Sequence, residues 1–235
     1  MFAYDCLLFF DLSLILYSTH PVTLSKMALF LFCKGSQAMT EFKVCVFCGS
    51  RSGNNPAYTD AAHAVAQELA SRGMQLVFGG GGTGLMGETA RTALNLGVSV
   101  TGIIPTFLIN QETPVEDLSE LLVVADMHER KAKMAELSDM FVVLPGGIGT
   151  MEEACEMITG NWIGLYNKPV GFLNVNGFFD SFFAFLKDAV DAGFMPVPCY
   201  ERAIVDNTAA GLLDKLVSAR CAPELPCNAD CFGHK

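Results

Sequence analysis

The chain has 235 residues, of which 51% are hydrophobic. This length suits one α/β domain with extensions, or at most two small domains, and it offers ample apolar residues for a buried core. The formal net charge of -10 at pH 7 argues against nucleic-acid binding, because an acidic surface repels a polyanion. A small anionic ligand is still compatible with it, since local backbone N–H groups can hold such a ligand.

Residues 1–38 differ in composition from the rest of the chain. They contain two apolar runs, at 6–17 and 27–33, and neither reaches the roughly 18 residues that a membrane-spanning helix needs. The second run follows Lys26 and precedes Ser36-Gln37-Ala38, a faint echo of a secretory signal peptide. We favour the alternative, a poorly ordered extension on a cytoplasmic protein without a membrane partner.

From residue 41 onward, short apolar strands alternate with helices. Strands are expected at 42–47, 74–78, 98–104, 121–124, 140–144, 169–173 and 203–205. Helices are expected at 58–71, 128–137, 150–162, 178–192 and 208–217. A further helix is expected to follow residues 79–87 and to end at 96. This alternation predicts an α/β fold with an open parallel sheet and helices on both faces. Residues 41–217 would form this domain, and residues 218–235 an irregular tail.

The nine cysteines do not form a disulfide pattern. Cys45 and Cys48 lie on one expected strand, where positions three apart point to opposite faces, so their thiols cannot easily meet. We expect reduced cysteines that pack in the core of an intracellular protein. Zinc binding in the tail is conceivable, but the spacings lack the short paired form of known sites, so we expect no metal at Cys221, Cys227, Cys231 and His234.

A first glycine-rich turn, residues 79–87, follows the strand at 74–78. It contains a G-x-G-x-x-G match, Gly82-Thr83-Gly84-Leu85-Met86-Gly87, whose glycines would let the backbone approach a phosphate. A dinucleotide site also needs an acidic residue near the end of the next strand, and that strand ends in Gly102-Ile103-Ile104-Pro105. NAD binding is therefore disfavoured, and we expect no cofactor. Close packing of helix on strand is the alternative explanation of these glycines.

A second glycine-rich turn, Pro145–Glu153 (PGGIGTMEE), follows the strand at 140–144. Ligands of open α/β sheets bind beyond the carboxyl ends of the strands, so two such turns could hold one small anion between them. No G-K-[ST] follows either turn, which argues against a P-loop NTPase. Thr150 and Glu153 could form a capping box and nothing more. Two carboxylates beside a phosphate loop nevertheless favour a ligand that develops positive charge.

The segment DMHERK, residues 126–131, begins the densest basic cluster of this acidic chain. Met127, Met134 and Leu137 would form the buried stripe of a short helix, with Arg130 and Lys131 beside it. A solvated basic face is the alternative, because most such runs face water. The strand at 140–144 follows closely, so this helix should lie near the second glycine turn.

These motifs together resemble those of the LONELY GUY family, the cytokinin riboside 5'-monophosphate phosphoribohydrolases. Pro145–Glu153 fits the signature P-G-G-x-G-T-x-x-E, and CVFCGS at 45–50, GGGGTGLMG at 79–87 and DMHERK at 126–131 agree in the same order. The resemblance covers roughly residues 41–217. The family has also been described as possible lysine decarboxylases, but we find no lysine here in a cofactor-anchoring motif.

The resemblance implies a Rossmann-like homodimer that removes the base from a nucleoside 5'-monophosphate. It makes Arg130 and Glu153 catalytic. It assigns substrate contacts to Lys131, Glu112, Thr159 and the loop residues Gly146, Gly147, Ile148, Gly149, Thr150, Met151 and Glu152. The segments around Glu112 and Thr159 depart from the family pattern, which leaves the preferred base open.

Cleavage of an N-glycosidic bond passes through a ribosyl cation, which carboxylates stabilise without a metal. We expect the 5'-phosphate to be held by the N–H groups of residues 146–150, together with the first turn through Gly80, Gly81 and Gly84. Glu153 would stabilise the cation or position the attacking water. Arg130 would orient the substrate and assist the departing base, and Lys131 would add charge near the phosphate.

The expected reaction converts N6-modified adenosine 5'-monophosphates to a free cytokinin-type base and ribose 5-phosphate. One alternative is a general AMP nucleosidase. A second is a carrier of molybdenum cofactor or nucleotide, and a third is a purine mononucleotide sensor. A carrier would not need both Arg130 and Glu153, so the presence of this pair favours an enzyme.

Overall fold

The computed structural model describes residues 42–109 and 113–222. The expected extension at 1–38, Glu112, and the tail residues Cys227, Cys231 and His234 lie outside the described residues. The described residues all belong to one structural unit that begins at Gln37. None of the helices described in this unit is long and apolar enough to cross a membrane.

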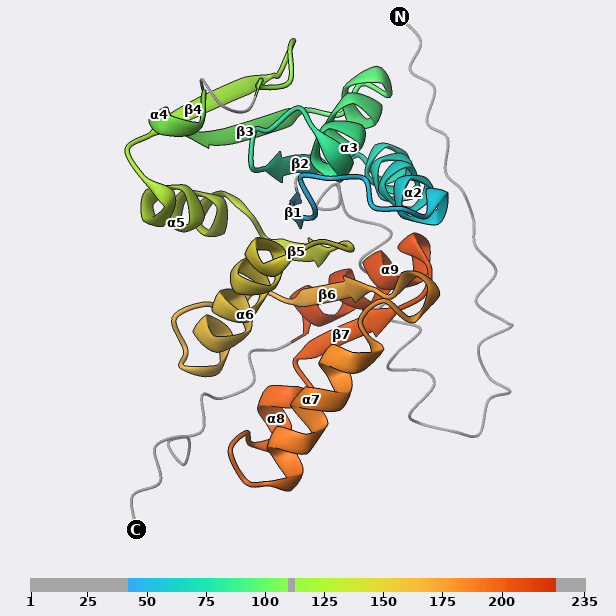
Figure 1. Ribbon diagram of the computed structural model, residues 1–235, viewed down its shortest axis with the longest axis vertical. Helices are drawn as coiled ribbons and strands as arrows, with labels where there is room; N and C mark the ends of the chain where they lie inside the picture. Colours follow the sequence, from blue (N-terminus) through green and yellow to red (C-terminus); the bar gives the residue numbers. More distant parts are fainter. Residues whose placement is uncertain (1–41, 110–112, 223–235) are drawn as a thin grey trace, which may run out of the picture. The chain divides into compact units, whose positions relative to one another are not determined.

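Seven strands form a single parallel sheet, in the order β4-β3-β2-β1-β5-β6-β7 (Figure 1). The strands are β1 (Lys43–Phe47), β2 (Gln75–Phe78), β3 (Val100–Pro105), β4 (Glu120–Val124), β5 (Met140–Val143), β6 (Val170–Leu173) and β7 (Ala203–Asp206). The predicted α/β fold is confirmed. The order builds outward in one direction from β1 to β4 and in the other from β5 to β7, so β1 and β5 flank the point where the order reverses.

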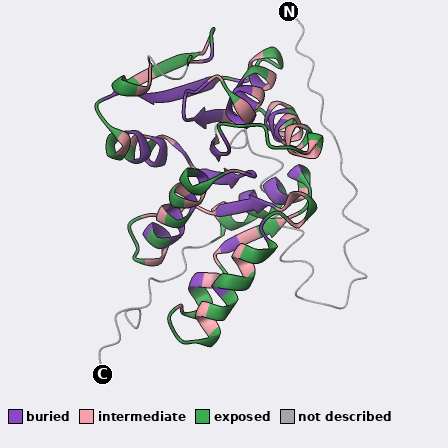
Figure 2. Cartoon of the chain, viewed as in Figure 1, coloured by how far each residue is buried: buried purple, intermediate pink, exposed green. Residues whose placement is uncertain are grey.

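The two faces of β1 pack into two separate apolar layers. Val44 and Val46 contact one layer with α2 (Pro56–Arg72), α3 (Gly84–Asn95) and α9 (Ala209–Cys221). Cys45 and Phe47 contact the other with α5 (Met127–Leu137), α6 (Ile148–Trp162) and the start of α7 (Asp180–Asp191). Figure 2 shows the inner strands buried. Both faces are covered because the helices that connect the parallel strands lie on one side of the sheet or on the other.

Cys45 and Cys48 pack into different layers, as opposite-face positions on a strand predict. Burial, the largest influence, raises the pKa of both thiols above its ordinary value, which keeps them protonated at neutral pH. Their position in the core agrees with the expectation that these cysteines are packing residues.

Local sequence signals explain where several helices begin. The Asn55 side chain accepts from the N–H of Ala57 at the start of α2, and Asp126 accepts from His128 and Glu129 at the start of α5. Such capping satisfies N–H groups that have no partner inside the helix. Gly73 ends α2 in the left-handed conformation, with φ of 65°.

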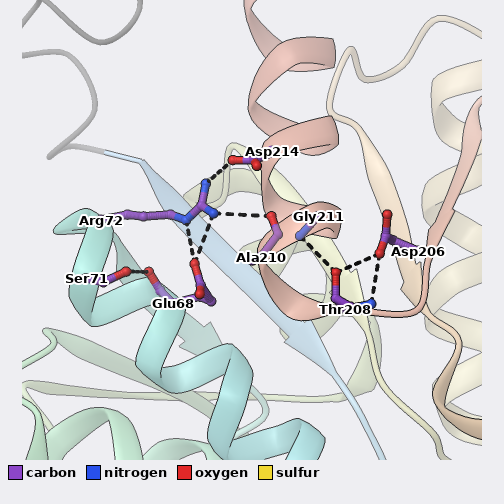
Figure 3. A network of polar contacts seen from close by, with 8 residues as sticks. All are labelled: Glu68, Ser71, Arg72, Asp206, Thr208, Ala210, Gly211 and Asp214. Carbon is purple, nitrogen blue, oxygen red and sulfur yellow. Dashed lines mark hydrogen bonds and ion pairs between the residues drawn. The ribbon is translucent and has the colours of Figure 1, made fainter.

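The layer of α2 and α9 is joined by a polar network (Figure 3). Arg72 donates to Asp214 at 2.8 Å and to the Ala210 carbonyl at 3.2 Å, and it also pairs with Glu68. Thr208 caps α9 by accepting from the Gly211 N–H. The contacts of Arg72 fix α9 against α2. Both helices lie on the opposite side of the sheet from α5 and α6.

Three short elements were not predicted: α4 (Thr106–Ile109), the 3-10 turn η3 (Val175–Gly177) and α8 (Val197–Tyr200). Each has three or four residues, too few for a hydrophobic period to show. The last helix continues to Cys221, past the expected end at 217, and Cys221 packs against the apolar layer of α2, α3 and α9.

Candidate functional site

A cavity of about 510 Å³ lies at the carboxyl ends of β1 and β5. This is the place where open α/β sheets bind ligands, because the loops diverge where the strand order reverses. The volume falls within the roughly 300–1,000 Å³ of small-molecule sites. Its wall is formed by the loops after β1 and β5, the first turns of α2, α3 and α6, and parts of α5 and the β6–α7 connection. The lining residues are Cys48, Gly49, Ser50, Arg51, Ser52, Gly53, Tyr58, Leu85, Met86, Met127, Arg130, Pro145, Gly146, Gly147, Ile148, Gly149, Thr150, Glu152, Glu153 and Phe178.

The second glycine turn forms one wall of this cavity. α6 begins at Ile148, with Gly147 in an extended conformation before it and no side chain capping its start. The first N–H groups of a helix have no partner inside it and carry partial positive charge. The start of α6 can therefore receive an anion. Nothing lies within 4 Å of the position that a Cβ would take at Gly147 or Gly149, so a ligand can approach the backbone there.

The capping box considered for Thr150 and Glu153 is absent. A capping residue must precede the helix. The helix was expected to begin at 150, but α6 begins at Ile148, so Thr150 is its third residue. Its buried hydroxyl lies where a Cβ on Gly146 would be, since that Cβ would come within 2.2 Å of Thr150 Oγ1. Glu153 is thus free of a capping role.

The loop after β1 lies opposite the start of α6. The Gly49 N–H donates to the Pro145 carbonyl at 3.0 Å. A Cβ on Gly146 would come within 2.8 Å of Gly49 N. The two loops therefore touch through glycine backbone, and residues 50–53 continue from this contact along the cavity wall.

Leu85 and Met86, at the end of the first glycine turn, line the cavity, but the glycines of this turn are not among its lining residues. Gly81 bridges to Pro114, the Gly82 N–H donates to the Thr113 carbonyl at 2.9 Å, and the Gly80 carbonyl accepts from Val115. Gly84, with φ of 57°, lies where a Cβ would be 2.3 Å from the Arg51 backbone N. Within the described chain, the cavity lining includes none of Gly80, Gly81 and Gly84. These glycines instead contact residues 113–115 and the Ser50–Arg51 backbone.

Arg130 is held by backbone carbonyls at the end of the sheet. Its Nη2 donates to the Gly79 carbonyl at 2.7 Å and its Nε to the Ile103 carbonyl at 3.2 Å. The side chain is buried, and no carboxylate among the described residues forms an ion pair with it. A guanidinium has five N–H donors, so donors remain for a ligand. The alternative of a solvated basic face is wrong, because Arg130 and Lys131 are among the buried residues of α5.

Glu153 is a half-buried carboxyl on α6 that lines the same cavity as Arg130. Burial raises its pKa from the ordinary 4.5 to about 7. The charge of Arg130 opposes this rise, and the neighbouring carboxylate of Glu152 adds to it. A carboxyl poised near neutral pH can act as an acid or a base in catalysis.

Lys131 turns away from the cavity toward α6. Its ammonium forms ion pairs with Glu152 and with Glu156, at 2.6 Å to Glu156 Oε2. Burial alone would lower the pKa of Lys131, but the bonds to the two glutamates outweigh it and leave the pKa raised. The expected charge near the phosphate is thus already shared by two carboxylates. Met151 is half-buried and packs against the core.

Thr159 lies on the exposed side of α6, eleven residues after its first residue and so about 16 Å along the helix. The structure brings Arg130, Glu153, Glu152 and residues 146–150 together around one cavity, and it does not bring Thr159 or Lys131 to that cavity. Glu112 lies outside the described residues.

The site residues predicted from the sequence did not include Arg51, Tyr58 and Phe178, which line the cavity, or Gly79, whose carbonyl accepts a hydrogen bond from Arg130. Tyr58 and Phe178 form an edge-on aromatic pair at 5.6 Å and line the cavity. Gly79 accepts Arg130 where a side chain would otherwise be, since its Cβ would come within 1.8 Å of Arg130 Nη2. The rule that ligands bind where strand order reverses could have pointed to the loop after β1.

The sequence matches the family model described as "Possible lysine decarboxylase" over residues 86–216. It is 47% identical over 174 residues to a probable cytokinin riboside 5'-monophosphate phosphoribohydrolase of Oryza sativa subsp. japonica, covering 74% of this chain and 78% of the relative. A cytokinin riboside 5'-monophosphate phosphoribohydrolase of Arabidopsis thaliana is 45% identical over 174 residues, covering 74% and 82%.

Solved structures with the same fold are more distant in sequence. The molybdenum cofactor carrier protein of Chlamydomonas reinhardtii superposes with a TM-score of 0.59 at 19% identity, over 77% of this chain and 99% of that chain. The molybdenum cofactor binding protein of Rippkaea orientalis gives 0.59 at 18% identity, over 76% and 96%. At such identities the likeness shows the fold alone.

Proposed function

Because the chain belongs to the family of the cytokinin riboside 5'-monophosphate phosphoribohydrolases, we propose that it hydrolyses the N-glycosidic bond of N6-modified adenosine 5'-monophosphates. The products are a free cytokinin-type base and ribose 5-phosphate. The single observation that best supports this chemistry is the half-buried carboxyl of Glu153 on the wall that also carries Arg130 and the start of α6.

In this proposal the 5'-phosphate binds the N–H groups at the start of α6, within residues 146–150. Those groups are not consumed by a side-chain cap, and nothing crowds the backbone at Gly147 and Gly149. A phosphate in this position gains from the helix dipole. It also anchors the ribose next to Glu153, which follows one turn later on the same helix.

Glu153 is the catalytic carboxylate. As the bond from C1' to the base nitrogen lengthens, the ribose gains positive charge, and an anion at this place lowers the energy of the transition state. Glu153 also positions the water whose oxygen bonds to C1' and accepts its proton. The electron pair of the broken bond stays with the base, which takes up a proton as it leaves.

Arg130 orients the substrate and assists the departing base. Its guanidinium cannot swing freely, because two of its N–H groups are bonded to the carbonyls of Gly79 and Ile103. A donor that is fixed before the reaction stabilises developing negative charge without reorganisation. The positive charge of Arg130 also favours the ionised form of Glu153.

The remaining assignments belong to the same proposal. We place the enzyme in the cytoplasm as a homodimer. Thr159 is about 16 Å along α6 from the phosphate end, so it contacts substrate only if a second copy brings its α6 to the cavity. Glu112 contacts the substrate, and Lys131 acts on it through its ion pair with Glu152.

The test separates an enzyme from a carrier or a sensor. The protein is incubated with isopentenyladenosine 5'-monophosphate and, separately, with AMP, and the products are resolved by chromatography. We expect equal amounts of free base and ribose 5-phosphate. Base should be released faster from the modified nucleotide than from AMP. Comparable or faster release from AMP would make it a general AMP nucleosidase. Tight binding without release of base would overturn hydrolysis and favour a carrier or a sensor.

A further inference from the structure

Arg51 is a charged residue of the cavity wall that the mechanism above does not use. It belongs to the loop after β1, which faces the start of α6. A nucleoside 5'-phosphate carries between one and two negative charges near neutral pH. The backbone N–H groups at the start of α6 supply only about half a unit of positive charge, so a bound phosphate needs a further cation.

The other two cations near the cavity have protein partners that fix their positions. Arg130 is buried against the carbonyls of Gly79 and Ile103, on the side of the sheet that holds Glu153. Lys131 is shared between Glu152 and Glu156, so this cluster carries a net negative charge beside the phosphate loop. Among the described residues that line the cavity, Arg51 and Arg130 are the two basic side chains.

Arg51 combines a fixed backbone with an unengaged side chain. The loop is fixed on both sides: Gly49 donates to the Pro145 carbonyl, and Gly84 packs its α-carbon against the Ser50–Arg51 peptide, where a Cβ would lie within 2.3 Å. Arg51 itself is exposed. Within residues 42–109 and 113–222, no hydrogen bond or ion pair holds its guanidinium.

We propose that Arg51 is a substrate-binding residue that pairs with the 5'-phosphate and selects nucleotides over nucleosides. This inference rests on the proposed function, because it takes the nucleoside monophosphate as the ligand. The α6 N–H groups contact the phosphate from one side and the Arg51 guanidinium from the other. A planar guanidinium suits this task, because it can donate two parallel hydrogen bonds to phosphate oxygens.

The experiment compares Arg51→Gln with Lys187→Gln. Lys187 is an exposed residue of α7 that pairs with Asp191, so its replacement changes the net charge equally but leaves the cavity intact. For Arg51→Gln we expect KM for the nucleoside monophosphate to rise about 10-fold to 100-fold, as loss of a charged hydrogen bond predicts. The value of kcat should change less than about threefold, because the phosphate is held equally in substrate and transition state. Arg51→Lys should recover part of the affinity, and Lys187→Gln should match the wild type.

A second readout is independent of activity. Binding of ribose 5-phosphate is measured by calorimetry on the same variants, with ribose as the ligand without phosphate. Arg51→Gln should weaken ribose 5-phosphate binding by the same factor and leave ribose unaffected. Unchanged KM together with unchanged ribose 5-phosphate affinity would overturn the role of Arg51. If the wild type released no base from any monophosphate, the proposed function would fail, and the ribose 5-phosphate comparison would still decide the role of Arg51.

Discussion

At the scale of single residues, the environment of Glu153 determines what the cavity can do. Its pKa is raised to about 7 chiefly by burial, so the ionised and neutral forms are both present at neutral pH. A fully solvated carboxyl would be ionised throughout that range but would stabilise a cation less, because water screens it. Partial burial thus makes the charge more effective and its ionisation dependent on pH.

This shift predicts the pH dependence of the reaction. The ionised carboxylate is the active form in our mechanism, and its fraction rises as pH increases through the raised pKa. We therefore expect kcat/KM to increase with pH, with an apparent pKa of about 7, and to level off above it. Steady-state rates between pH 5 and 9 measure this. A rate that falls as pH rises through 7 would instead assign Glu153 the role of an acid.

Replacement of Gly79 by alanine is predicted to reduce activity strongly and to change the stability of the fold little. A Cβ at this position would come within 1.8 Å of Arg130 Nη2, so Gly79→Ala should displace the guanidinium, whose flexible end can move. We expect kcat/KM to fall on the order of 100-fold, with a loss of less than about 2 kcal/mol in unfolding free energy.

The control for Gly79 is a double-mutant cycle. If the alanine acts through Arg130, adding Gly79→Ala to Arg130→Ala should cost little more activity than Arg130→Ala alone. Additive losses would show that Gly79 acts on the ligand or the fold by another route.

At the scale of elements, the two loops that form the cavity depend on backbone contact between glycines. Gly146 lies against both Thr150 and the backbone of Gly49, whereas a Cβ on Gly149 would meet nothing within 4 Å. The two glycines belong to one turn, but glycine is needed at each position for a different physical reason. Gly146 allows two loops to touch, and Gly149 leaves the helix start open to a ligand.

This difference predicts opposite effects on stability. Gly146→Ala should lower the unfolding free energy by about 1–3 kcal/mol or more, because the added methyl collides with the buried Thr150 side chain and with the backbone of Gly49. Gly149→Ala should leave it unchanged or raise it by up to about 1 kcal/mol, since alanine favours the helix. Chemical denaturation of the two variants provides the comparison. Equal stabilities would mean that the contact between the loops is not structural.

The elements were predictable where their signals are local. Asn55 and Asp126 cap α2 and α5, and the apolar runs of the strands place them to within one or two residues. Thr150 misled because Thr-x-x-Glu is also a capping pattern, whereas in the structure Gly147 precedes α6 and the helix begins at Ile148. Arg130 and Lys131 read as a solvated or flanking face, because the carbonyls and carboxylates that bury them come from distant segments.

At the scale of the whole described unit, alternation of strands and helices was enough to predict a parallel sheet. The strand order was not predictable from the sequence, and the site depends on it. The first glycine turn matches a phosphate-binding pattern more fully than the loop after β1, but its backbone is bonded to residues 113–115. The loop after β1 lines the cavity because β1 lies beside β5 where the order reverses.

Hydrolysis in the proposed mechanism depends above all on the carboxylate of Glu153. The most direct test compares wild type with Glu153→Gln, for both binding of isopentenyladenosine 5'-monophosphate and release of its free base in a single turnover. We predict that the variant binds the nucleotide within about threefold of the wild type and releases base at least 100-fold more slowly, because the carboxylate acts on the transition state. Release at a near-normal rate would contradict the account and leave Glu153 as a structural residue of α6.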